Sequence, residues 1–134
     1  SPIRISGGEH HYGRWEHQAL LDARAVDILQ PDVTWCGGIS ELMRIADLAR
    51  AAGVPVYPHT NLLQPTVDAA AALGGEWAPL VEYPVHSDTF DAPHFLKDPA
   101  VGAAGAVHLP RSAGLAMELD ESKIEQQREV SFNW

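Results

Sequence analysis

The sequence is poor in cysteine, with Cys36 as the only one among 134 residues. A single thiol excludes an internal disulfide framework, and by itself it cannot form a thiolate metal site. Such sparing use of cysteine is typical of reducing compartments, so we expect a cytoplasmic protein.

Basic residues and long apolar runs are also scarce. Nine Lys and Arg stand against 18 Asp and Glu, which gives a formal net charge of -9. An acidic surface disfavours the phosphate backbone of nucleic acids, so we expect no DNA or RNA partner. No apolar run approaches the ~18 residues of a membrane span, so we expect no membrane partner either.

The composition that remains, 46% hydrophobic and 20% charged, is that of an ordinary soluble domain. Four short apolar segments recur along the chain, and each ends at an ionisable residue. The segments are residues 3–9, 26–32, 54–59 and 80–82, and their last residues are Glu9, Asp32, His59 and Glu82. The recurring pattern predicts four strands.

Helix-like stretches lie between these segments. In residues 15–25 the pattern places Trp15 and Ala19 on one face, and residues 39–49 repeat apolar side chains at i, i+3 and i+4. Residues 65–73 begin with proline and end before Gly74, the usual asymmetry of helix boundaries. Gly53 stands where a helix-ending residue with positive φ is needed. The alternation of strand and helix predicts an α/β fold with parallel strands.

Parallel strands joined by right-handed crossovers present their C-terminal ends at one edge, where α/β enzymes hold their chemistry. The four ionisable residues would then lie side by side. A simpler explanation is also open, because polar residues often end strands where the chain leaves the core. After Glu82 the rhythm stops. We therefore expect residues 1–85 to form βα units and residues 86–134 a loop-rich tail of the same domain, with a short polar helix at 122–130.

Four motifs resemble the enolase superfamily, in its mandelate racemase-like branch, and most closely the L-rhamnonate dehydratases. They are SGGEHH at 6–11, DILQPDVTWCGG at 27–38, VYPH at 56–59 and GLAMEL at 114–119. The resemblance implies strands five to eight of a (β/α)8 TIM-type barrel, plus a tail that packs on a capping domain. Four strands cannot close a barrel of eight, so we expect the chain to belong to a longer polypeptide.

The resemblance also implies roles for the strand-end residues. Glu9 matches the third of three acidic Mg²⁺ ligands, and Asp32 and His59 match a catalytic pair. His59 would remove the C2 proton of a sugar acid and then protonate the departing 3-hydroxyl, which yields a 2-keto-3-deoxy acid. Glu82 would donate a hydrogen bond to the enediolate, and His10 would contact the substrate.

Several alternatives stay open. A racemase or epimerase of the same superfamily would use a second base on a strand outside this sequence, and a non-catalytic scaffold would need no contact between Asp32 and His59. Trp35 either lines the substrate pocket or packs under the next helix, and we expect His17 on the surface or on a helix face. The resemblance further implies a small-molecule substrate and a homo-oligomer.

Overall fold

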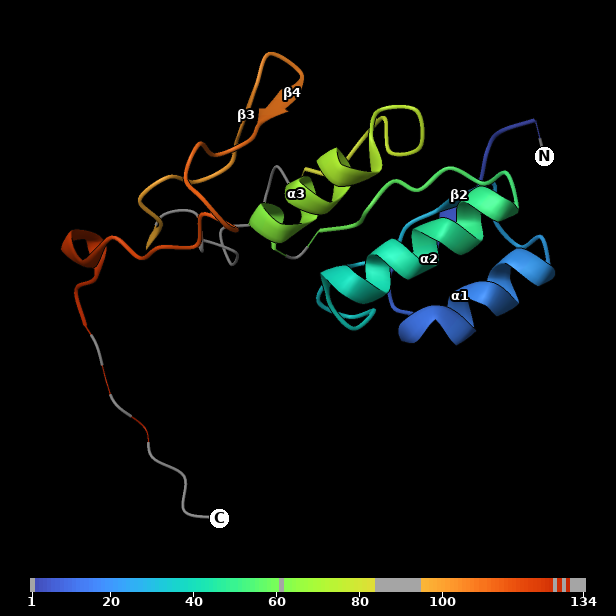
Figure 1. Ribbon diagram of the computed structural model, residues 1–134, viewed down its shortest axis with the longest axis horizontal. Helices are drawn as coiled ribbons and strands as arrows, with labels where there is room; N and C mark the ends of the chain where they lie inside the picture. Colours follow the sequence, from blue (N-terminus) through green and yellow to red (C-terminus); the bar gives the residue numbers. More distant parts are fainter. Residues whose placement is uncertain (1, 61, 84–94, 127, 129, 131–134) are drawn as a thin grey trace.

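The structure is a computed structural model, and it describes all residues except 1, 61, 84–94, 127, 129 and 131–134. In chain order its elements are β1 (Ser6–Gly7), α1 (Gly13–Asp22), β2 (Ile28–Leu29), α2 (Ile39–Ala51), α3 (Leu63–Leu73), β3 (Val101–Ala103), β4 (Ala106–His108) and a 3-10 helix at Glu121–Lys123. Helix α1 packs on α2, and α3 separates this pair from the β3–β4 hairpin (Figure 1).

Parallel pairing links the first three predicted strand segments. Strands β1 and β2 pair in parallel, with Ser6 opposite Ile28. Two isolated parallel bridges, Leu29 to Val56 and Asp32 to His59, add the third segment. The predicted parallel arrangement of these three segments is confirmed, although the regular strands are only two residues long.

The fourth segment, residues 80–82, forms no strand, so this part of the prediction is wrong. Its last residue still lies beside the third segment, because the Glu82 N–H donates to the carbonyl of Pro58 at 3.2 Å. This one backbone bond brings the ionisable end of the fourth segment to the edge that the other segments share.

The second and third predicted helices are confirmed, each with a positive-φ glycine after its end. Helix α2 runs to Ala51 and is followed by Gly53 at φ 70°, and α3 runs to Leu73 and is followed by Gly74 at φ 81°. Glycine tolerates this left-handed conformation because it has no Cβ.

Helix α1 differs from its prediction in position and in the face that it buries. It spans 13–22 instead of 15–25, and Trp15 is 80% exposed. The buried side chains are His17, expected on the surface or on a helix face, and Leu21. Burial of His17 is tolerated because its Nδ1 pairs with the carbonyl of Gly13 at 2.7 Å, which satisfies one polar nitrogen of the ring.

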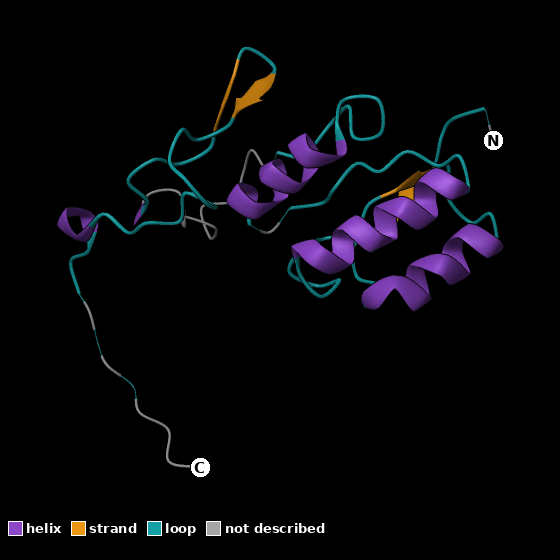
Figure 2. Cartoon of the chain, in the orientation of Figure 1, coloured by secondary structure: helices purple, strands orange, loops and turns teal. Residues whose placement is uncertain are grey.

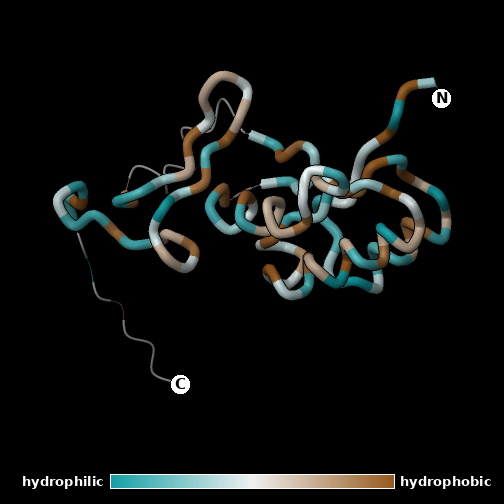
Figure 3. The backbone as a smooth tube through the Cα atoms, turned by 45° about the horizontal axis from the view of Figure 1, so that its top comes forward, coloured by the Kyte–Doolittle hydropathy of each residue, from teal (hydrophilic) through white to brown (hydrophobic). Residues whose placement is uncertain are grey.

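The core lies between the parallel segments and the helices that cover them (Figure 2). Hydrophobic and hydrophilic stretches alternate along the backbone (Figure 3). Burying one face of each helix in this way supplies the main stabilising free energy. The largest fully buried apolar side chains are Leu29, Leu42, Ile45 and Val56.

The tail contains a hairpin that the sequence did not predict and lacks a predicted helix. Strands β3 and β4 pair antiparallel through a turn in which Ala104 and Gly105 both have positive φ. The helix expected at 122–130 is wrong, because only Glu121–Lys123 form a single 3-10 turn and the described residues after it are not helical. The turn is mostly exposed, so it has no buried apolar face to extend it. The expected boundary at residues 85 and 86 lies outside the described residues.

Within the described part of the chain, no helix is both long enough and apolar enough to cross a membrane.

Candidate active site

An aspartate and a histidine are paired at the edge that the parallel segments share. The Asp32–His59 bridge places the two residues opposite each other, and His59 Nδ1 lies 2.8 Å from Asp32 Oδ2. The Asp32 side chain is fully buried, whereas that of His59 is 16% exposed. The imidazole is therefore anchored from inside the fold and keeps an open side.

Asp32 is held in its ionised form by hydrogen bonds. Burial alone would raise its pKa, but bonds from the Thr34 hydroxyl, the His59 ring and the backbone N–H groups of Thr34 and Trp35 outweigh burial and lower the pKa below its usual value. An ionised carboxylate only accepts hydrogen bonds, so Nδ1 of His59 carries the proton of this contact. Nε2 of His59 is then the nitrogen left for chemistry.

Two further carboxylates lie near Nε2 of His59. Glu9 Oε2 is 3.2 Å away and Glu82 Oε2 is 3.8 Å away. Their side chains are 43% and 45% exposed, so a ligand from solvent can reach both. All four predicted strand-end residues thus meet at one place, which confirms their expected proximity.

The turn before Glu9 requires glycine. Gly8 is buried and has φ 116°, and a Cβ there would lie 3.4–3.6 Å from side-chain atoms of Leu29, Leu20 and His17. The positive φ lets the chain leave β1 and turn the Glu9 carboxylate toward His59. His17, on the far side of Gly8, therefore supports this turn from the core.

The carboxylates fit one part of a Mg²⁺ site. Mg²⁺ prefers hard oxygen ligands, and the accessible Glu9 carboxylate can supply one. Across the described ranges of the chain, however, no group of three or more His, Cys, Asp or Glu side chains is arranged to hold a metal ion. Glu9 is thus a suitable single ligand and not a complete site.

Three aromatic side chains form a cluster beside the carboxylates. The ring centroids of His10 and Trp35 are 5.1 Å apart, and those of Tyr12 and Trp35 are 5.6 Å apart. His10 Nε2 also lies 3.7 Å from Glu9 Oε1. His10, predicted to contact substrate, therefore borders the site through Glu9, and no contact joins it to His59 in the described structure.

Sequence reasoning missed Thr34, Tyr12 and Glu41. Thr34 had a recognisable signal, because an Asp two residues before a Thr often accepts its N–H in a local turn. Glu41 binds Arg14 through both carboxylate oxygens, at 2.8 and 2.7 Å, and so ties the start of α1 to the start of α2. Nothing in the spacing of these two residues, 27 apart, indicates that pair.

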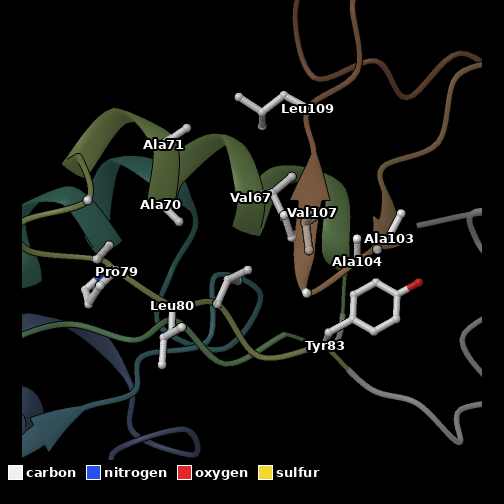
Figure 4. A pocket seen from close by; sticks show the side chains of 16 residues that line it. Val67, Ala70, Ala71, Pro79, Leu80, Tyr83, Ala103, Ala104, Val107 and Leu109 are labelled. Atoms are coloured by element: carbon white, nitrogen blue, oxygen red, sulfur yellow. The ribbon is translucent and has the colours of Figure 1, made fainter.

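A separate apolar cavity borders the fourth segment through Leu80 and Val81. It has a volume of about 580 Å³ and is lined by the Tyr83 ring and by small and aliphatic side chains of α3, of residues 78–81 and of the β3–β4 hairpin (Figure 4). Neither a carboxylate nor an imidazole lines it, so the chemistry belongs to the open edge at His59.

Comparison with known proteins places these features in context. Residues 1–123 match a family model described as enolase C-terminal domain-like. The chain is 36% identical to D-galactarolactone cycloisomerase of Agrobacterium fabrum, over 95% of this chain and 36% of that protein. It is 43% identical to arabinonate dehydratase of Saccharolobus solfataricus, over 56% of this chain and 21% of that protein.

Among solved structures, the chain is similar to L-talarate dehydratase from Polaromonas sp. JS666 complexed with Mg and L-glucarate, with a TM-score of 0.76 and 29% identity. That match covers 90% of this chain and 32% of the other. The chain therefore spans about a third or less of the length of the proteins it matches here.

Proposed function

Because the chain belongs to the enolase C-terminal domain-like family of the enolase superfamily, we propose that it carries the catalytic pair of a Mg²⁺-dependent acid-sugar dehydratase, with L-rhamnonate as the first candidate substrate. The observation that carries the proposal is the 2.8 Å contact between buried Asp32 and His59, whose Nε2 faces the partly exposed carboxylates of Glu9 at 3.2 Å and Glu82 at 3.8 Å. Relatives that include an arabinonate dehydratase support the substrate class.

His59 is the proposed acid and base. Asp32 fixes the tautomer and orientation of the ring, and this leaves Nε2 as the nitrogen that accepts a proton. Nε2 accepts the C2 proton, and the electrons of the C2–H bond pass into the carboxylate as an enediolate. The C3–O bond then breaks, and the imidazolium returns its proton to the departing hydroxyl, which leaves as water. The enol product becomes a 2-keto-3-deoxy acid by tautomerisation.

The two glutamates have separate proposed roles. Glu9 would be one ligand of Mg²⁺, and the other acidic ligands would lie on barrel strands that precede these four. When bound, Mg²⁺ would stabilise the negative charge that develops on the substrate carboxylate. Glu82, on the other side of Nε2, would donate a hydrogen bond to the enediolate, a role that requires its protonated form.

The proposal extends to the fold of the whole enzyme. Residues 1–85 would supply strands five to eight of a (β/α)8 barrel, and residues 86–134 would be a tail of the same domain that packs on a capping domain. The shared edge of the parallel segments supports this arrangement, because barrel enzymes build their sites at the C-terminal ends of strands. A homo-oligomeric, cytoplasmic enzyme is part of the same proposal.

The decisive experiment replaces His59 with Asn in the intact enzyme that contains this chain. Proton exchange between C2 of the substrate and deuterated solvent is followed by NMR. We expect exchange and keto-acid formation to fall by about 10²–10⁴-fold, the usual contribution of a general acid–base group. His108→Asn, which changes an exposed histidine of β4, is the matched control and should keep both activities. Retained exchange in His59→Asn would remove His59 as the base.

One other reaction has specific support. The similarity to a D-galactarolactone cycloisomerase favours proton abstraction that ends in isomerisation instead of water loss. Screening aldonic acids and sugar lactones with Mg²⁺ separates the two reactions by mass spectrometry, because dehydration removes one water from the substrate whereas isomerisation leaves its mass unchanged. The contact between Asp32 and His59 argues against a purely non-catalytic scaffold, which would have no need for it.

A further inference from the structure

The geometry points to a specificity wall made of Trp35, His10 and Tyr12, against which the non-reacting end of the sugar acid packs. This inference rests on the proposed function and deepens it: His59 acts at C2 and C3, and the aromatic wall selects the carbons beyond them. The occupant is the polyol end of a sugar acid, whose C–H faces suit aromatic rings and whose hydroxyls suit polar ring edges.

The wall is a continuous set of ring contacts with exposed faces. Trp35 lies in the middle, 5.1 Å from the ring of His10 and 5.6 Å from that of Tyr12. Trp35 is 39% exposed and Tyr12 57% exposed. Trp35 therefore does not pack wholly under the following helix, the simpler of the two arrangements that its sequence position allows.

Two independent routes connect the wall to the catalytic pair. Through the backbone, the Trp35 N–H donates to Asp32 Oδ1 at 3.2 Å. Through side chains, His10 lies 3.7 Å from Glu9, and Glu9 lies 3.2 Å from His59. The wall thus begins beside the reacting centre, where the rest of a bound substrate has to lie.

The wall is also held in place before any ligand binds. The Gly13 N–H donates to the carbonyl of Cys36 at 3.1 Å and so joins the loop that carries His10 and Tyr12 to the loop that carries Trp35. The two-point ion pair of Arg14 with Glu41 fixes the same junction. Preorganised rings bind with a smaller entropic cost, which is typical of built binding surfaces.

Trp15 shows how this differs from an ordinary exposed aromatic residue. It is 80% exposed, and its ring lies 5.8 Å from the guanidinium of Arg14. No ring contact or hydrogen bond links its side chain to Asp32, Glu9 or His59 in the described structure. Trp15 therefore provides a matched control.

The test compares a six-carbon sugar acid with a four-carbon analogue that keeps C1 to C3, in the intact Mg²⁺-loaded enzyme. In Trp35→Leu, we expect kcat/KM for the six-carbon acid to fall by about 10–100-fold, in the range of a lost pocket contact. For the four-carbon acid it should change by less than about threefold, because that substrate does not reach the wall. Trp35→Phe should restore most of the loss, and Trp15→Leu should change neither value.

Each outcome bears on the wall separately from the proposed function. Equal losses for both acids would overturn the wall, since Trp35 would then act only through Asp32. Unchanged kcat/KM values for both acids would overturn the wall as well. Should Trp35→Leu fail to fold, Tyr12→Leu carries the same test at a more exposed position. If C2 proton exchange survives in His59→Asn, the proposed function is wrong. If exchange is lost in His59→Asn but the ratio of kcat/KM for the two acids is unchanged in Trp35→Leu, only the wall is wrong.

Discussion

Asp32 illustrates how a single residue can be both structural and reactive. Its side chain is fully buried, a position that disfavours a charge, yet its hydrogen bonds lower the pKa of the carboxyl. The same charge then fixes the proton of His59 on Nδ1. Burying this carboxylate has a free-energy cost, but the buried charge orients the His59 ring.

Replacing Asp32 with Asn should separate the orientation of the His59 ring from the binding of the substrate. The amide has nearly the same shape, but it can donate to Nδ1 and so favour the wrong tautomer of His59. We expect kcat of the intact enzyme to fall by about 10³–10⁴-fold with little change in KM. Steady-state kinetics with the preferred sugar acid check this, and a loss of less than about tenfold would contradict the tautomer argument.

The sequence predicted that the ionisable residues at the segment ends lie together, but it did not predict which polar side chains are buried. Glu9, Asp32, His59 and Glu82 follow apolar segments at similar intervals, and the structure brings them together. His17 was expected on the surface or on a helix face; it lies on α1 but is buried, and its Nδ1 pairs with the Gly13 carbonyl in the first turn of that helix. The spacing of apolar residues does not predict which backbone group will accept or donate a hydrogen bond to a buried polar side chain.

Among whole elements, helices with two agreeing sequence signals were the easiest to predict. Helix α2 combines apolar periodicity with a glycine after its end, α3 combines a proline in its first turn with a glycine after its end, and both were located correctly. The β3–β4 hairpin was missed because its strands have three residues each and no clear alternation. Its turn residues, Ala104 and Gly105, give a weaker signal than an Asn-Gly pair.

The pairing of α1 with α2 depends on Glu41. Hydrogen bonds from Arg14, and a weaker one from Arg44, lower the pKa of Glu41 from 4.5 to about 2. A lowered pKa means that the folded state favours the ionised form. The stabilisation is therefore complete above pH 4.5 and is lost as the pH falls toward 2.

In the intact enzyme, Glu41→Gln should lower the melting temperature at neutral pH, and the difference from the unsubstituted enzyme should shrink as the pH falls toward 2. Thermal unfolding followed by circular dichroism at several pH values measures this. Asp47→Asn is the control on the same helix, because Asp47 is 73% exposed and has one long contact with Arg50. A difference that is independent of pH would show that Glu41 stabilises the helix pair by packing and not by charge.

At the scale of the whole molecule, much apolar surface faces outward. Ile3 is 72% exposed and Leu80 61% exposed, and both belong to segments at the ends of the parallel set. The cavity between α3 and the β3–β4 hairpin adds further apolar lining that no described residue fills (Figure 4). The parallel pairs also leave strand edges open, a condition that folded proteins usually avoid.

These features predict that residues 1–134 expressed alone will not behave as an independent domain. The isolated chain should self-associate and unfold without a single cooperative transition, since its apolar surface and open strand edges lack the segments that would cover them. The intact enzyme, in which about two thirds of the chain length lies elsewhere if it resembles its relatives, should melt cooperatively. Size-exclusion chromatography with light scattering and calorimetry compare the two. A monodisperse monomer of 14.5 kDa with one sharp transition would show that the four segments form a complete folding unit and would remove the structural basis for the half-barrel.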